Sequence, residues 1–152
     1  SSLVPAWVKL GELRYKLGRA AEAEQAWRRA LTLDEAQFGV WRALSSLLFS
    51  RGELQDALEV LQRASSRPGA PADLQVDIAL ILLRSGKQEE GIEKLKQISS
   101  TDLEIDARTQ SVLGWAYLQK KELEAAETTL RRAIELNPND AFAHNNLGVL
   151  YD

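Results

Sequence analysis

Glycine recurs at a fixed interval along this chain. Gly18, Gly52 and Gly86 are separated by two steps of 34 residues, and Trp7 and Trp41 are also 34 residues apart. A fixed period of this length indicates an array of one supersecondary unit, in which each unit packs mainly against its neighbours. Such arrays present extended surfaces for binding. The period therefore favours a binding function over a catalytic one.

The composition disfavours some classes of binding partner. Hydrophobic residues make up 45% and charged residues 27% of the 152 positions, as in ordinary folded proteins. The net charge of −3 disfavours a nucleic-acid partner, because nucleic-acid-binding surfaces usually carry a basic excess. No apolar run approaches the length of about 18 residues that a membrane helix needs, so we predict no membrane insertion.

Two residue types are absent from the sequence. The lack of cysteine excludes disulfides, thiolate metal sites and a cysteine nucleophile. It is compatible with the cytoplasm and the periplasm alike, so the sequence does not indicate the location of the protein. Because the sequence also lacks methionine, we expect it to be a piece of a longer protein.

The period divides the chain into four full units and the beginning of a fifth: residues 4–37, 38–71, 72–105, 107–140 and 141–152. Apolar residues at helical spacing predict two helices in each full unit, and the recurring glycine ends the first helix in a left-handed conformation. Lys121 takes the place of this glycine in the fourth unit, at an expected cost of about 1 kcal/mol. Asp106 and Asp140 are predicted helix N-caps.

Small residues recur at two further positions of the unit. Gly11, Ser45, Ala79, Gly114 and Gly148 share one position, and Ala23, Ala57 and Ala126 share another. Small side chains allow antiparallel helices to approach closely. The third unit departs from this pattern, with Gly91 in the alanine position and Ile98 in another small position. The stretch from Pro68 to Pro71 predicts an altered junction after the second unit.

Three runs of sequence resemble the tetratricopeptide repeat. They are AWVKLGELRYKLG in the first unit, VLGWAYLQKKELEAAETTLRRAIELNPND in the fourth, and AFAHNNLGVLYD, which is similar to the first helix of another repeat. The resemblance covers residues 4–152. It implies an all-α fold, a right-handed superhelical solenoid of antiparallel helix pairs forming a single array over residues 1–152. It also implies a non-catalytic protein without a cofactor.

In this family the first helices line a concave groove, and the resemblance places ten residues of this chain on that surface. They are Tyr15, Lys16, Arg42, Phe49, Leu80, Leu83, Arg84, Trp115, Leu118 and Asn146. Trp115 is the informative member, because it lies outside the positions at which the repeat requires large residues. Aromatic and arginine side chains often dominate binding energy, so we predict a peptide or helix of a partner protein in this groove. The alternative is that Trp115 and Leu118 pack against neighbouring helices.

Two binding modes of the family are not supported by the residues present. Glu12, Asp73 and Asp77 occupy positions that a carboxylate clamp would need to be basic or amide, and they would repel a carboxylate. Of an asparagine ladder along the groove, only Asn146 is present.

No catalytic or metal-binding group stands out. His144 is the single histidine, and no cysteine can join it in a metal site. We therefore predict no metal, no cofactor and no enzymatic activity. Besides a peptide-binding scaffold, two functions stay open: end-to-end self-association through residues 141–152, and a targeting arm of a larger enzyme.

Overall fold

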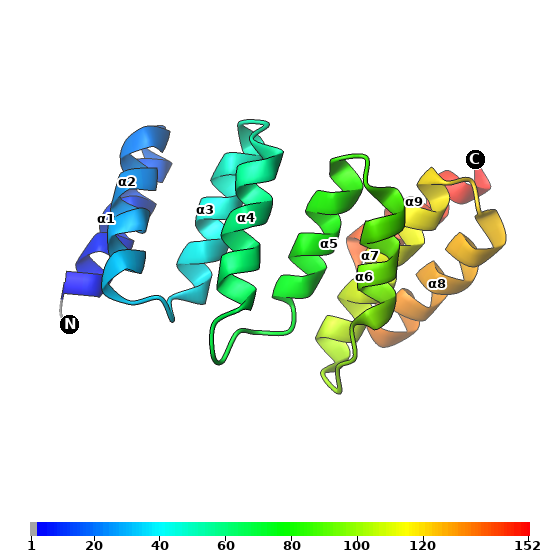
Figure 1. Cartoon of the computed structure of the whole chain (residues 1–152). Helices are drawn as coiled ribbons and strands as arrows, with labels where there is room; N and C mark the ends of the chain where they lie inside the picture. Colours follow the sequence, from blue (N-terminus) through cyan, green and yellow to red (C-terminus); the bar gives the residue numbers. More distant parts are fainter. Residues whose placement is uncertain (1–2) are drawn as a thin grey trace. The chain divides into compact units, whose positions relative to one another are not determined.

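The computed structural model describes residues 3–152, which contain nine α-helices and no strand (Figure 1). The helices are α1 (Leu3–Lys16), α2 (Ala20–Leu33), α3 (Phe38–Ser50), α4 (Leu54–Ser65), α5 (Leu74–Arg84), α6 (Gln88–Gln97), α7 (Leu103–Gln119), α8 (Leu123–Leu136) and α9 (Ala141–Tyr151). The prediction of an all-α fold of helix pairs is confirmed.

The chain forms two compact units, Ser1–Leu74 and Gln75–Asp152. The first contains α1 to α4, and the second contains α5 to α9. In the first unit α1 packs on α2 and α3 on α4, while α2 also contacts α3. In the second unit α7 packs on α8, and α9 contacts both of them. The prediction of one continuous array stays a prediction.

The turn inside each helix pair contains a left-handed residue, as the sequence predicts. Gly18, Gly52 and Gly86 have φ values of 74°, 79° and 81°, and Lys121 has a φ of 61°. Glycine adopts this conformation without a steric penalty, whereas lysine does not. The fourth pair therefore keeps the turn of the other three although its sequence lacks the glycine.

Close approach of paired helices explains the small residues of the first helices. A Cβ atom on Gly11 would lie 2.3 Å from the Trp27 indole, and one on Gly114 would lie 2.6 Å from Leu130 Cγ. In the second pair the Ser45 hydroxyl donates a hydrogen bond to the Ala57 carbonyl, at 3.0 Å. At each of these positions the small residue therefore allows a residue of the following helix to contact the first helix directly.

The start of α7 differs from the prediction. Asp102 caps this helix, and its carboxylate accepts hydrogen bonds from the backbone amides of Glu104 and Ile105. The predicted cap Asp106 is wrong, because it lies inside the first turn of α7. The extra turn brings Ile105 against the hydrophobic core of the second unit, which favours the earlier start. The other predicted cap is confirmed, since Asp140 accepts a bond from the Ala143 amide.

The stretch from Pro68 to Pro71 lies in the loop between α4 and α5. Gly69 is left-handed there, with a φ of 78°. An altered junction at this point stays a prediction.

Candidate protein-binding surface

In the first unit, the predicted groove residues lie on α1 and α3 and differ in their contacts. Tyr15 is 51% exposed, and its ring centroid lies 5.8 Å from that of Trp27. Lys16 is exposed and Phe49 is half-buried. Arg42 is half-buried and donates to Asp73 Oδ2 at 2.7 Å. The first unit therefore offers one exposed aromatic ring and one arginine that is already paired.

In the second unit, Trp115 on α7 is half-buried between two side chains from other helices. The Arg84 guanidinium of α5 lies 4.9 Å from the centre of the Trp115 ring. The Phe142 ring of α9 lies at a centroid distance of 6.4 Å, tilted by 57°. The inner part of Trp115 packs against the core, as does half-buried Leu80. Trp115 therefore packs against the core with one side and is partly accessible on the other, and its role as a groove residue stays a prediction.

A small pocket adjoins Trp115. Its volume is about 180 Å³, and it is lined by Leu83, Arg84, Gln88, Trp115, Ala116 and Gln119. Arg84 has no carboxylate partner among the described residues, in contrast to Arg42. Leu118, the remaining predicted residue of α7, is half-buried. This part of the second unit combines an accessible indole with an arginine whose N–H groups can bind a ligand.

Two predicted groove residues are buried. Leu83 is only 6% exposed and belongs to the core cluster of the second unit, so it contributes no more than part of the pocket floor. It turns inward because Gly91 leaves room for it, and a Cβ atom at Gly91 would lie 2.7 Å from Leu83 Cγ. Asn146 is also 6% exposed, and its amide donates to the Phe142 carbonyl of its own helix at 2.8 Å. The expectation that these two side chains face a groove is therefore wrong.

Ion pairs join positions that are 31 residues apart. Arg42 pairs with Asp73 in the first unit, and Arg108 pairs with Asp77 in the second. The sequence places both aspartates at the positions of the family's carboxylate clamp, and these positions do not by themselves indicate an arginine partner. Opposite charges at one spacing in successive repeats are the signal that could have revealed these pairs. Each pair neutralises charge on the first helices, which leaves Lys16 and Arg84 as the predicted groove cations without a carboxylate partner among the described residues.

The described residues hold neither a metal-binding cluster nor a membrane-spanning helix. Residues 3–152 contain no group of three or more histidine, cysteine, aspartate or glutamate side chains placed to hold a metal ion. None of the helices in this part of the chain is both long enough and apolar enough to cross a bilayer.

Family models match both halves of the sequence. A model described as tetratricopeptide repeat matches residues 8–71, and one described as TPR repeat matches residues 114–152. This chain is a tetratricopeptide repeat protein. The family accounts for the paired helices and the small residues between them. The tetratricopeptide family also explains the positions of Trp7 and Trp41, whereas Trp115 lies outside its pattern.

Two curated relatives match this tetratricopeptide protein over most of its length. A human protein O-mannosyl-transferase, TMTC1, is 24% identical over 89% of the chain. The peroxisomal targeting signal receptor of Kluyveromyces lactis is 26% identical over 96% of the chain. The chain spans 15% of the first relative and 26% of the second.

Solved structures share the fold. The structure of pilF from Pseudomonas aeruginosa has a TM-score of 0.79 and 22% identity, covering 97% of this chain and 67% of that one. The structure of YrrB, titled as a TPR protein with an unusual peptide-binding site, has a TM-score of 0.64 and 17% identity, covering 95% and 74% of the two chains. At these identities the similarity establishes the fold alone.

Proposed function

We propose that this protein is a non-catalytic scaffold that binds a peptide or helix of a partner protein on the inner surface of its first helices. The observation that carries the proposal is the pairing of Arg84 with the accessible side of Trp115. Tryptophan and arginine are the residue types most enriched where binding energy concentrates. The similarity to YrrB, described as having an unusual peptide-binding site, and to a peroxisomal targeting signal receptor supports this role.

The geometry near Trp115 suits an extended or helical segment that carries an apolar and an acidic side chain. The apolar side chain would lie against Trp115 and half-buried Leu118, and the carboxylate would accept hydrogen bonds from Arg84. The Arg84 guanidinium already contacts the indole, at 4.9 Å from the ring centre, which restricts the orientations of its side chain. A cation restricted in this way loses less side-chain entropy on binding than a freely rotating one.

The first test measures binding and stability in the same variants. Peptides are selected against the wild type from a random linear library. For the tightest of them, we expect Arg84→Gln and Trp115→Ala each to raise Kd by about tenfold or more. Arg84 is exposed, so Arg84→Gln should leave the melting temperature unchanged, whereas Trp115→Ala should lower it modestly. Arg132→Gln, which removes an exposed charge from α8, is the matched control and should bind normally. If Arg84→Gln binds as tightly as the control, the proposed surface is not the binding site.

Self-association through residues 141–152 is a second candidate function, and the position of Gly148 favours it. A Cβ atom on Gly148 would meet nothing within 4 Å, whereas Gly11 and Gly114 at the same repeat position lie under a large side chain. Val149 and Tyr151 of the same helix are 56% and 58% exposed. If this face binds a second copy, light scattering should show a dimer that Gly148→Leu disrupts. A constant monomer mass across a hundredfold range of concentration would exclude it.

The third hypothesis, a targeting arm of an enzyme, is compatible with the name of the human relative, a protein O-mannosyl-transferase. Because the chain matches only 15% of that protein, the similarity supports a shared repeat segment, and the activity of any longer protein stays a hypothesis.

A further inference from the structure

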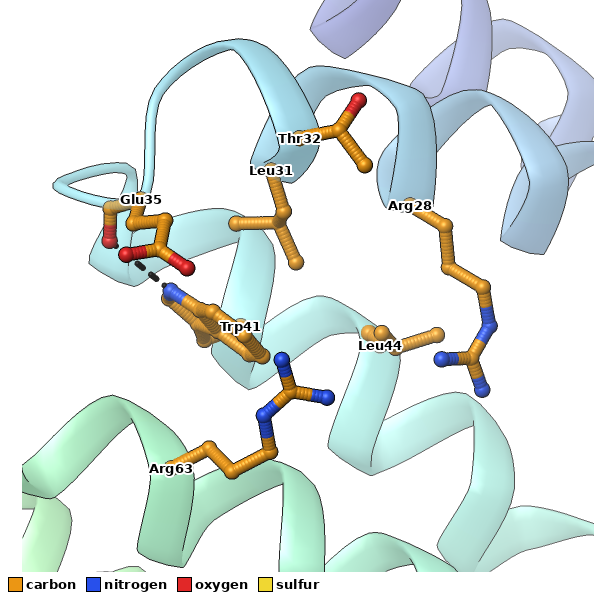
Figure 2. A pocket seen from close by; sticks show the side chains of 7 residues that line it. All are labelled: Arg28, Leu31, Thr32, Glu35, Trp41, Leu44 and Arg63. Atoms are coloured by element: carbon orange, nitrogen blue, oxygen red, sulfur yellow. Dashed lines mark hydrogen bonds between the residues drawn. The ribbon is translucent and has the colours of Figure 1, made fainter.

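A second pocket, in the first unit, shares no residue with the predicted groove. It lies between α2, α3 and α4 and has a volume of about 220 Å³. Figure 2 shows its lining residues, which are Arg28, Leu31, Thr32, Glu35, Trp41, Leu44 and Arg63. This volume lies below the range of about 300–1,000 Å³ that is typical of small-molecule sites. The pocket is therefore of a size to hold one or two amino-acid side chains.

The floor of the pocket is apolar and fixed in position. Leu31, Trp41 and Leu44 form it, and all three are buried. The Trp41 indole N–H donates a hydrogen bond to the Glu35 carbonyl at 2.9 Å, as Figure 2 shows. This bond sets the plane of the indole ring. A side chain that enters the pocket would therefore meet a preformed apolar surface.

Arginine side chains from two helices extend toward this floor (Figure 2). The Arg63 guanidinium of α4 lies 5.7 Å from the centre of the Trp41 ring. Among the described residues, no hydrogen bond or ion pair involves the Arg63 guanidinium. Arg28 of α2 contacts Glu24 through Nε and Nη2, which leaves Nη1 for a further acceptor. Both guanidinium groups therefore retain N–H donors for a ligand.

The carboxylates near the pocket already have cationic partners. Glu35 accepts a hydrogen bond from Arg67 at 2.7 Å. Glu24 binds Arg51 as well as Arg28. Burial raises the pKa of Glu24, but the hydrogen bonds from Arg51 and Arg28 outweigh this effect and lower the pKa overall, so Glu24 stays ionised at neutral pH. Arg63 is therefore the cation at this pocket that lacks a carboxylate.

We propose that this pocket binds an acidic side chain, together with an adjacent aliphatic side chain, from a peptide segment of a partner protein. The carboxylate would accept charge-assisted hydrogen bonds from Arg63 and from Nη1 of Arg28. The aliphatic side chain would cover Leu31 and the edge of Trp41. The surface of the first unit would then hold a second contact for a partner, separate from the Trp115 surface of the second unit.

Defined peptides test this assignment on the whole chain. The tripeptide Ac-Leu-Glu-Leu-amide and its glutamine counterpart Ac-Leu-Gln-Leu-amide are titrated while the indole N–H signal of Trp41 is followed by NMR. We expect a saturable shift with the glutamate peptide and about tenfold weaker binding of the glutamine peptide. Arg63→Gln should remove this difference. Arg29→Gln carries the same charge change on α2 outside the pocket and should preserve it.

Other outcomes would overturn the proposal. They are no shift of the Trp41 signal up to the solubility limit of the peptide, equal affinity for the two peptides, or an unchanged preference in Arg63→Gln. Inorganic phosphate is a further probe, and phosphate binding as tight as that of the glutamate peptide would show a general anion site instead. Melting temperatures of both variants verify folding. Trp115→Ala should leave these titrations unchanged, so failure here is distinguishable from failure of the proposed function.

Discussion

Trp27→Ala is expected to lower the free energy of unfolding of the first unit by about 3–5 kcal/mol, the range for a core tryptophan. Trp27 is 4% exposed, and its indole lies directly over Gly11 of the paired helix. Gly11 has no side chain that could move into the space that the indole leaves, so the substitution is expected to create a cavity between the two helices. The loss should appear as a lower midpoint of urea unfolding, followed by far-UV circular dichroism.

Two further variants separate this packing from general effects on α2. Leu33→Ala removes an apolar side chain that is 38% exposed in the same helix, and it should cost well under half as much. Gly11→Ala adds a single methyl group that would lie 2.3 Å from the indole, and we expect it to cost about 1–3 kcal/mol although alanine favours helix. Wild-type stability of Gly11→Ala would show that the two helices lie farther apart than the structure has them.

The sequence predicts the helix pairs well because their determinants are local and repeat. The left-handed turns at Gly18, Gly52 and Gly86 follow from a residue type that tolerates this conformation. Lys121 adopts the same left-handed turn because the two flanking helices fix its geometry. The repeat period predicts this turn, although lysine as a residue type does not. The cap of α7 was missed because Asp102 and Asp106 are equally suitable by residue type, and the packing of Ile105 decides between them.

The candidate site is less predictable, because it depends on which side chain of a helix turns inward. Repeat position alone assigns Tyr15 and Leu83 to the same surface, yet one is exposed and the other buried. The difference originates in the partner helix, where Gly91 replaces the alanine of the other units. The pairing of Arg84 with Trp115 joins α5 to α7, and the pairing of Arg63 with Trp41 joins α4 to α3. Neither contact follows from a spacing within one helix.

Leu83→Ala should lower the free energy of unfolding of the second unit by about 2–5 kcal/mol. The expectation follows from its burial at 6% exposure and its place among the core residues of α5, α6 and α7. Truncating a side chain that faced a groove would change the free energy of unfolding only slightly. The same urea unfolding measurement therefore distinguishes a buried Leu83 from the groove-facing Leu83 that its repeat position implies. A loss of unfolding free energy below about 1 kcal/mol would support the groove assignment instead.

The complementary change is Gly91→Ala, which introduces the residue that the other units carry. Helix propensity alone predicts a gain of about 1 kcal/mol, but the new Cβ atom would lie 2.7 Å from Leu83 Cγ and 3.1 Å from the Ala79 carbonyl oxygen. We expect a net loss of about 1–3 kcal/mol, and a smaller loss in the Leu83→Ala background, where most of the clash is absent. Gly148→Ala in α9, where a Cβ atom meets nothing within 4 Å, should instead be neutral or stabilising. Additive losses in the double variant would mean that Leu83 and Gly91 do not share this space.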